Sequence, residues 1–403
     1  MNVTYGCYRM ARVVLAMSGG VDSSVAALLL QRAGHEVIGL FMRTGVHAEA
    51  HNQGRKQGCC SSLDAHDARN VADRLDIPFY ALDFAAEFDR IMDYFADEYV
   101  LGRTPNPCVM CNNWLKFGKL WEYGRELGAD FVATGHYAQI VPGQHGPELH
   151  RAVDTTKDQS YVLFGIQKEL LHRLLLPVGG YTKPQIRMLA QEAKLPVFNK
   201  PDSVEICFVP QGQHAAFVQA RRPGWDRPGP IVDNQGHVVG QHHGIAGFTV
   251  GQRKGLGVAA GDRRYVLEIV PASATLVVGS EHDLNQAGLI AERCHWLDVP
   301  PRQPMTVQVK ISYRDAAVPA TVHTACSTDE AWLTRSLQPH ETLVRFHEYQ
   351  RGIAPGQAAV FYQGSQVLGG GWIRQPWSAP GLDKAQPAST PAQDVVESRS
   401  SHS

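Results

Sequence analysis

Short apolar runs alternate with amphipathic segments over the first 135 residues, and this alternation restricts the fold more than any other feature. The runs 13–17, 37–42, 79–82 and 131–134 have the length and composition of buried strands. Between them, apolar residues recur at helical spacing. Because strands that alternate with helices pair in parallel, the sequence predicts an α/β fold with a doubly wound parallel sheet.

The pattern changes twice further along the chain, and each change marks an expected domain boundary. We predict that the α/β domain covers 11–168 and that a small central domain covers 169–250, with helical stretches and loops rich in Pro and Gly. Short alternating runs over 251–375 predict a β-barrel-like domain. Residues 1–10 and 376–403 are expected to be a disordered leader and tail.

The composition excludes several classes of protein. The net charge is −1, from 38 basic and 39 acidic residues, which excludes a histone-like coat protein and an acidic disordered chain. No apolar stretch approaches the ~18 residues of a membrane span, and no signal-like core opens the chain. Eight cysteines in 403 residues are too few for a disulfide scaffold. We therefore expect a cytoplasmic protein with no membrane partner.

The net charge nevertheless conceals regions of opposite sign. Segment 59–99 carries a net charge of −7, whereas 101–125 and 253–264 each carry +3. Because contacts with a phosphate backbone need local basic surface and not a basic protein, the near-neutral total does not exclude a nucleic-acid partner.

The first expected strand leads into the segment 18–24, Ser-Gly-Gly-Val-Asp-Ser-Ser, and then into an apolar helix. Glycines let backbone N–H groups approach an anion closely, a helix N-terminus carries partial positive charge, and the serine hydroxyls add donors. The segment lacks the Gly-Lys of the Walker sequence. It resembles the PP-loop of enzymes that cleave ATP between the α and β phosphates. The alternative is that the segment has only a structural role, as a Gly-rich turn with capping serines.

Two cysteines are candidates for sulfur chemistry. Cys111 follows the proline-rich segment 104–108, and we expect a helix to begin near Asn112 or the next residue. A cysteine at a helix N-terminus with lysines nearby is placed for a lowered thiol pKa, and the thiolate is the nucleophilic form. Cys207 lies in a short apolar run, and the sequence alone does not pair it with Cys111.

Other readings of the cysteines stay open. Cys108 and Cys111 form a Cys-x-x-Cys pair, which is half of a zinc site if Cys59 and Cys60 complete it, or else a redox pair. No second Cys-x-x-Cys and no His pair at zinc spacing accompanies them. The remaining cysteines, isolated in the sequence and expected to be unreactive, are Cys7, Cys294 and Cys326.

Seven motifs in order along the chain resemble those of the bacterial tRNA-specific 2-thiouridylases, a family of PP-loop enzymes. The resemblance runs from about Met10 to Arg374 and implies an adenine nucleotide alpha hydrolase-like fold for the first domain. The motifs are segment 18–24, Thr-Pro-Asn-Pro at 104–107 before Cys111, Ala-Thr-Gly-His-Tyr at 133–137, Lys-Asp-Gln-Ser-Tyr at 157–161, Ile-Cys-Phe at 206–208, Gly-Gln-Arg-Lys-Gly-Leu-Gly at 251–257 and Ser-Tyr-Arg at 312–314.

The resemblance implies a tRNA-uridine 2-sulfurtransferase that acts on C2 of the wobble uridine in tRNAs for Lys, Glu and Gln. ATP adenylates the base, with Mg²⁺ helping to neutralise the phosphates, and persulfide sulfur then displaces AMP. Cys111 is implied as the nucleophile and Cys207 as the persulfide carrier, and the two close a transient disulfide. A route in which Cys111 releases hydrosulfide from Cys207 stays open.

The same resemblance implies the binding residues and the partners. The residues implied in ATP binding are Ala16, Met17, Ser18, Gly19, Gly20, Val21, Asp22, Ser23, Met42 and Gly135. Those implied in tRNA binding are Asn106, Pro107 and Cys108 beside the target base, with His136, Lys157, Asp158, Gln159, Tyr313, Arg314 and Gln357. The partners are tRNA and a sulfur donor protein, either a cysteine desulfurase or a sulfur-relay protein, and we expect a monomer.

One position departs from part of the family. Some members carry Asp, a candidate general base, where this chain has Cys108, so the identity of the base stays open. An iron–sulfur cluster on Cys108, Cys111 and Cys207 is a further alternative that we do not favour. The rival functions are another PP-loop ligase that acts on a small metabolite, and a non-catalytic RNA-binding or zinc protein.

Overall fold

The computed structural model describes residues 10–46, 62–202, 206–209, 212–258, 263–325 and 337–378. The expected leader up to residue 9, the tail from 379 and the cysteines at 7, 59, 60 and 326 lie outside this description. Across the described part of the chain, no helix combines the length and the apolar character needed to cross a membrane.

The N-terminal domain is built on a five-stranded sheet with the order β3-β2-β1-β4-β7, and every pairing in it is parallel. This confirms the predicted parallel sheet. Its strands are β1 (Arg12–Ala16), β2 (Glu36–Arg43), β3 (Phe79–Asp83), β4 (Phe131–Thr134) and β7 (Leu174–Leu175).

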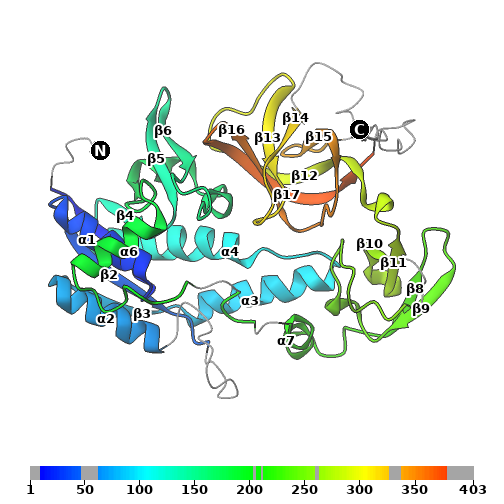
Figure 1. Cartoon of the computed structure of the whole chain (residues 1–403), viewed down its shortest axis with the longest axis horizontal. Coiled ribbons are helices and arrows are strands. Elements are labelled where there is room, and N and C mark those ends of the chain that lie inside the picture. The colour runs from blue at the N-terminus through cyan, green and yellow to red at the C-terminus, as the bar shows by residue number, and fades with distance from the viewer. Residues whose placement is uncertain are drawn as a thin grey trace, which may run out of the picture.

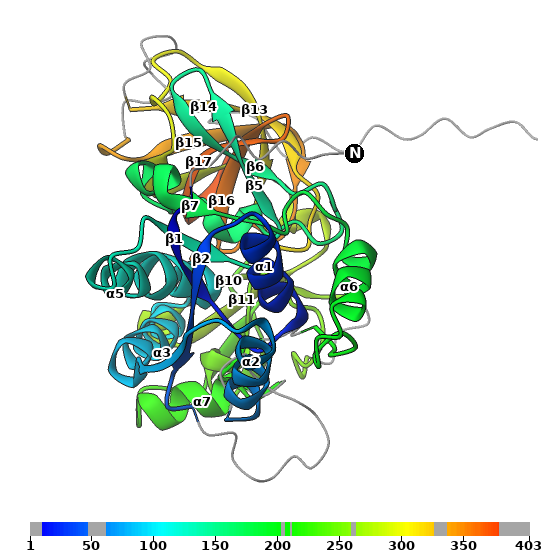
Figure 2. The same cartoon turned by 90° about the vertical axis from the view of Figure 1, so that its left-hand side faces the viewer.

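Helices cover both faces of this sheet because successive side chains along each strand alternate between two cores. Val14 and Ile38 join one core, and Val13 and Val37 join the other. Figure 2 shows α1, α2 and α6 on one side of the strands and α3 and α5 on the other. Their bounds are α1 (Val21–Arg32), α2 (Ser62–Leu75), α3 (Ala85–Val100), α5 (Leu120–Glu126) and α6 (Lys183–Glu192).

A continuous helical stretch of changing pitch joins α3 to the last strands of the sheet. It consists of α4 (Pro107–Met110), the π-helix η1 (Cys111–Lys119) and α5. Pro107 occupies the first turn, and the Asn106 side chain accepts a hydrogen bond of 3.4 Å from the Val109 N–H. Proline at the first helical position and Asn at the cap are typical of a helix start, so the helix begins at Pro107.

This start corrects the expectation that Cys111 lies at a helix N-terminus. Cys111 lies about one turn inside the helical stretch, whereas Cys108 lies in its first turn. Prolines at 105 and 107 favour a stiff segment before a helix, but a proline also fits inside the first helical turn, as Pro107 does here.

The C-terminal domain is a closed antiparallel barrel of six strands, which confirms the β-barrel-like prediction. The order is β12-β15-β14-β13-β16-β17, and pairing of β12 with β17 closes it. The strands are β12 (Gln286–Trp296), β13 (Met305–Lys310), β14 (Val318–Thr324), β15 (Thr342–Gln350), β16 (Ala358–Gln363) and β17 (Gln366–Trp377). Strand β17 pairs with β12 as far as Trp377, so the first two residues of the predicted tail belong to this strand.

A hairpin from the N-terminal domain extends the barrel sheet. Strands β5 (Ala138–Gly143) and β6 (Gly146–Arg151) follow β4 directly, and His150 of β6 pairs with Gln366 of β17. Figure 1 shows this hairpin standing beside the barrel. The first and last domains are therefore joined by main-chain pairing as well as by side-chain packing.

The central region contains a small sheet with the order β10-β11-β8-β9. Its strands are β8 (Gly229–Val232), β9 (Val238–His242), β10 (Tyr265–Val270) and β11 (Thr275–Gly279). The sequence pattern predicted helical stretches and loops up to residue 250, and it missed β8 and β9. Of their side chains, only Ile231 and His242 are buried, so neither strand shows apolar alternation.

Ion pairs dock the remaining helix of the central region, α7 (His214–Arg221), onto α3. Arg221 bonds to Asp89 and Asp93, and Arg222 bonds to Asp93 and Asp97. Part of the acidic segment 59–99 is thus matched by arginines more than 120 residues away. Short 3-10 helices also occur, and these are η2 (Ser160–Leu163), η3 (Lys168–Arg173), η4 (Ile245–Gly247), η5 (Pro271–Ser273) and η6 (His282–Leu284).

Candidate active site

A cavity of about 440 Å³ opens where the strands β1 and β4 end and α1 begins. Ligands of parallel α/β sheets bind at this edge, and pockets of about 300–1,000 Å³ suit small molecules. Of the residues expected to bind ATP, all but Gly19 line the cavity: Ala16, Met17, Ser18, Gly20, Val21, Asp22, Ser23, Met42 and Gly135. The structure thus brings together the set that the sequence predicted.

The segment 18–24 is held in shape by its own serines. The Ser18 N–H donates to Ser23 Oγ at 3.2 Å, and the hydroxyls of Ser23 and Ser24 donate to the Gly20 carbonyl at 3.2 and 2.8 Å. Ser24 is fully buried and does not line the cavity. Its hydroxyl therefore stabilises the turn and is not the anion donor expected from the sequence.

Two glycines allow the segment to pack closely on its surroundings. Gly19 has a φ of +71°, and a Cβ there would overlap the carbonyl of Asp64. A Cβ on Gly135 would lie 2.6 Å from the Ser23 nitrogen, closer than real contacts allow. The end of β4 therefore meets the loop backbone to backbone, which requires glycine at this position.

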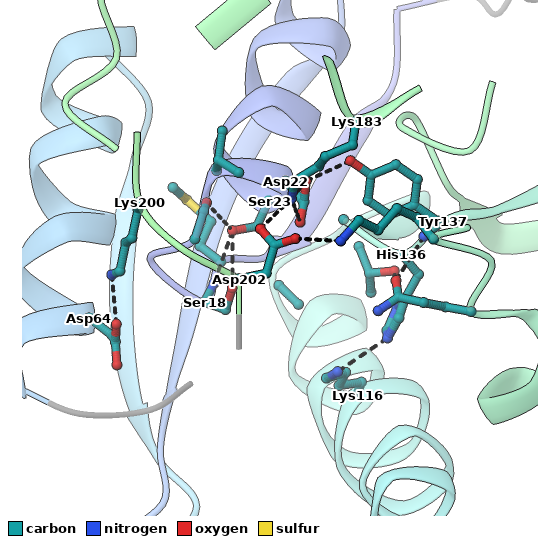
Figure 3. Close-up of a pocket in the computed structure, with 18 of the residues that line it drawn as sticks. Ser18, Asp22, Ser23, Asp64, Lys116, His136, Tyr137, Lys183, Lys200 and Asp202 are labelled. Carbon is teal, nitrogen blue, oxygen red and sulfur yellow. Dashed lines mark hydrogen bonds and ion pairs between the residues drawn. The ribbon is translucent and has the colours of Figure 1, made fainter. Parts of the chain in front are cut away.

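Lys183, at the start of α6, binds the aspartate of the segment. Its Nζ lies 2.7 and 2.8 Å from the two carboxylate oxygens of Asp22 and 2.8 Å from Asp202 Oδ1. The Tyr137 hydroxyl donates to Asp22 at 2.8 Å (Figure 3). Burial, followed by the charge of Asp22, raises the pKa of Tyr137 far above its usual value, so the phenol stays protonated.

A second lysine closes the opposite side of the segment. Lys200 Nζ donates to the Gly19 carbonyl at 2.7 Å and pairs with Asp64 at 2.6 Å and Asp67 at 2.5 Å. Burial opposes the charge on Lys200, but the bonds to the two carboxylates outweigh it and raise the pKa of the ammonium. Sequence reasoning missed Lys183, Lys200 and Asp202 as site residues, although Lys200 and Asp202 directly precede the Cys207 motif.

His136 lies between the nucleotide cavity and the helix that carries Cys111. Its Nδ1 is 2.7 Å from Thr134 Oγ1 and its Nε2 is 3.3 Å from Lys116 Nζ (Figure 3). Burial, followed by the charge of Lys116, holds the pKa of His136 well below its usual range. The imidazole is therefore neutral, which fits its place at a strand end but leaves a tRNA contact as a prediction.

Of the other residues expected to contact tRNA, the cavity wall includes Lys157, Gln159 and Tyr313. Lys157 pairs with Asp202 at 2.9 Å, and the Gln159 side chain accepts from the Tyr137 N–H at 2.9 Å. Tyr313 is 46% exposed and remains accessible to a ligand.

The rest of this set serves internal contacts or lies away from the cavity. Asp158 accepts from the Ala152 and Ser160 N–H groups at 3.1 Å, and the Gln357 amide donates to the carbonyls of Thr104 and Pro105 at 3.2 and 3.1 Å. Gln357 therefore anchors the loop before Cys108. Asn106 and Pro107 are buried, whereas Cys108 and Arg314 are exposed and outside the cavity wall.

The two candidate sulfur carriers are half-buried and pack against one hydrophobic core. Cys111 and Cys207 both contact this core, and Phe208, next to Cys207, stacks edge-on against Phe88 and Phe95 of α3. Neither cysteine lines the nucleotide cavity. Phe208 thus packs on α3, the helix that also contacts α4 and η1.

Within the described residues, no group of three or more His, Cys, Asp or Glu side chains is arranged to hold a metal. The cavity carboxylates of Asp22, Asp64 and Asp202 are each bonded to lysine. Because Mg²⁺ in nucleotide sites is held largely by phosphates and water, these carboxylates are compatible with a magnesium ion brought by ATP.

A parallel sheet with a PP-loop cavity, followed by two β domains, defines the class of this protein as a nucleotide-binding enzyme with a HUP domain. Three family models match it in succession. The models described as tRNA methyl transferase HUP domain, tRNA methyl transferase PRC-barrel domain and Aminomethyltransferase beta-barrel domain match residues 11–211, 216–280 and 286–373.

Relatives with similar sequences over nearly the whole chain identify the family. The tRNA-specific 2-thiouridylase MnmA of Rhodopirellula baltica is 46% identical over 392 residues, which cover 90% of this chain and 96% of the relative. That of Rhodospirillum centenum is 44% identical over 385 residues, covering 93% and 94%. The chain belongs to the tRNA-specific 2-thiouridylase family.

Two solved structures are similar to about half of this chain. A 4-thiouridine synthetase in complex with RNA and bound ATP is 17% identical, covers 49% of this chain and 45% of the other, and has a TM-score of 0.33. The NMN synthetase of Francisella tularensis is 16% identical, covers 49% and 68%, and has a TM-score of 0.30.

Proposed function

We propose that this chain transfers sulfur to C2 of the wobble uridine in tRNAs for Lys, Glu and Gln, with ATP as co-substrate and 2-thiouridine, AMP and pyrophosphate as products. One observation carries the proposal beyond family membership. The PP-loop cavity shares its wall with Lys157, Gln159 and Tyr313, so that residues from the barrel and from the tRNA motifs border the nucleotide site. A base presented there lies beside the phosphates.

In the first step, the segment 18–23 and the N-terminus of α1 bind the ATP phosphates through backbone N–H groups. Gly135 leaves room for the segment against β4. Mg²⁺ bound to the phosphates supplies charge neutralisation. Uridine O2 then attacks the α-phosphorus and releases pyrophosphate, which converts a poor leaving oxygen into a phosphate ester.

In the second step, sulfur replaces the activated oxygen. The terminal sulfur of a persulfide on Cys207 attacks C2, and AMP leaves with the electron pair of the C–O bond. The Cys111 thiolate then attacks the inner sulfur of Cys207, which leaves the thione on the base and a Cys111–Cys207 disulfide. A thiol reductant must open that disulfide before the next turnover.

Cys108 stands where some members of the family carry Asp. It lies in the first turn of the helical stretch, and its side chain is exposed to solvent. We propose that Cys108 lies beside the target base and takes part in proton transfer there.

The partners follow from this chemistry. We propose that a cysteine desulfurase or sulfur-relay protein loads Cys207, and that a monomer carries out the reaction in the cytoplasm, where tRNA is available. The exposed basic residues Arg253, Lys254 and Arg263 of the central region are candidates for contacts with the tRNA backbone.

The test is incubation of the chain with ATP, a persulfide donor and unmodified tRNA, followed by nucleoside analysis. We expect 2-thiouridine from the wild-type chain, none from Cys111→Ser or Cys207→Ser, and full activity from Cys294→Ser, a control in the barrel. Absence of 2-thiouridine with the wild-type chain overturns the assignment, and ATP cleavage to AMP without tRNA favours a small-metabolite ligase. Unchanged activity of the Cys111 and Cys207 variants refutes the sulfur relay.

A further inference from the structure

A lysine that the steps above do not use lines the nucleotide cavity. Lys116 belongs to the π-helix η1, five residues after Cys111, the first residue of that helix. Because hydrogen bonds in a π-helix join residues five apart, Lys116 lies one turn beyond Cys111. It therefore connects the helix of the proposed nucleophile with the nucleotide site (Figure 3).

Lys116 differs from the other lysines of the cavity wall in its partners. Lys157 pairs with Asp202, Lys183 with Asp22 and Asp202, and Lys200 with Asp64 and Asp67. Within the part of the chain that the structure describes, no carboxylate lies within ion-pair distance of Lys116. Among the described residues, therefore, no carboxylate balances the charge of Lys116.

The hydrogen bond that Lys116 does make keeps this charge intact. An ammonium group can only donate, so His136 Nε2 accepts at 3.3 Å, and the ring proton lies on Nδ1, which donates to Thr134 Oγ1. The neutral imidazole fixes the direction of the lysine side chain without neutralising it. The bond to His136 uses one of the three ammonium N–H groups, and Lys116 lines the cavity.

We propose that Lys116 is a catalytic residue of the adenylation step, where its ammonium contacts the α-phosphate of ATP. This inference rests on the proposed function and extends it. In that step, uridine O2 forms a bond to the α-phosphorus while the bond from this phosphorus to the bridging oxygen breaks. Pyrophosphate leaves with the electron pair, and the N3 proton passes to water through the proton transfer proposed above for Cys108. A preorganised cation at this phosphate stabilises the charge that builds up.

The same contact serves the second step. When sulfur attacks C2, the C–O bond breaks and AMP leaves with its electron pair, so negative charge grows again on the phosphate that Lys116 contacts. One lysine held by His136 thus assists both the formation and the departure of the activating group.

The test measures the partial reactions separately in Lys116→Met, with Lys119→Met as the matched control. Lys119 ends the same helix, has a half-exposed side chain and pairs with Glu122 at 2.8 Å. We expect Lys116→Met to slow tRNA-dependent pyrophosphate release in a single turnover by about 10²–10³-fold, the usual effect of removing one such donor. Lys116→Arg should recover part of the rate. Loading of Cys207 with persulfide and the melting temperature should not change.

A rate for Lys116→Met within threefold of the wild-type rate overturns the proposal, and so does a change confined to the KM for tRNA with kcat unaltered. If Lys116→Met lowers the melting temperature, the rate of pyrophosphate release is measured in Lys116→Gln instead and compared with that of Lys119→Met. Failure of the wild-type chain to form 2-thiouridine is a different result, which contradicts the proposed function itself.

Discussion

Replacing Gly135 by Ala should displace the PP-loop, because the added methyl group has no space. The new Cβ would lie 2.6 Å from the Ser23 nitrogen and 2.8 Å from the Asp22 carbonyl carbon, both of them backbone atoms. Ordinary contact begins at 3.4 Å, so the loop must retreat by about 0.8 Å. Strand β4 cannot yield instead, since it is paired with β1 and β7.

Overpacking of this kind costs about 1–3 kcal/mol of unfolding free energy. A loop moved by this distance also loses alignment of its N–H groups with the phosphates, and a loss of about 1.4 kcal/mol corresponds to tenfold weaker ATP binding. We therefore expect Gly135→Ala to bind ATP at least about tenfold more weakly than wild type.

The assay is equilibrium dialysis with labelled ATP, together with urea denaturation followed by circular dichroism. Gly247→Ala is the matched control, because a Cβ at Gly247 meets no atom within 4 Å. We expect the control to match the wild-type chain in both measurements. Gly135→Ala with unaltered ATP affinity and unaltered unfolding free energy would refute the close-approach argument.

Three further predictions concern groups around the cavity. Lys200→Met leaves the buried carboxylate of Asp64 without its cation and should lower the free energy of unfolding by about 3–5 kcal/mol. Urea denaturation measures this change, and a loss below about 1 kcal/mol would contradict the prediction. Burial raises the pKa of Asp202, but bonds from Lys183 and Lys157 outweigh it and hold that pKa below its usual range. Asp202 therefore stabilises the fold at pH values above its usual pKa of about 3.9. This stabilisation is lost as the pH falls through the lowered pKa of the folded state. Acid denaturation of Asp202→Asn should then depend less steeply on pH below about 4 than that of wild type, and equal slopes would contradict the sign. Gln357→Leu should slow 2-thiouridine formation while ATP binding stays unchanged, and an unchanged rate in single-turnover nucleoside analysis would argue against its anchoring role.

The sequence was sufficient to predict features that depend on local pattern. Four strands of the parallel sheet, the PP-loop segment and the β-rich C-terminal region all follow from apolar spacing and from glycine and serine at fixed positions. The residues expected at the ATP site also converge on one cavity, apart from Gly19, whose carbonyl instead accepts a bond from Lys200.

Charge partners from distant segments could not be predicted in this way. Lys183 is 161 residues from Asp22, and Lys200 is 136 residues from Asp64. No periodicity connects such positions, because the sheet topology alone brings α6 and the segment after it to the end of β1. The sequence marks Lys116 only as a lysine near Cys111, whereas its orientation toward His136 depends on the π-helical pitch.

The remaining wrong predictions concern segments whose residue types fit two different local structures. The prolines at 105 and 107 suggested a rigid lead-in, whereas Pro107 begins the helix and moves Cys111 away from its N-terminus. Strands β8 and β9 escaped notice because Gly, Pro, His and Gln dominate them and few of their side chains are buried.

The sharing of one sheet by the β5–β6 hairpin and the barrel has a consequence for synthesis on the ribosome. Strand β17 pairs with both β6 and β12, and it is the last strand of the described chain. The edges of β6 and β12 that pair with β17 therefore stay unpaired until residues 366–377 have left the ribosome. The parallel sheet of the N-terminal domain is complete by then. Pairings across such sequence separations form slowly, so we expect this last strand to set the pace of maturation.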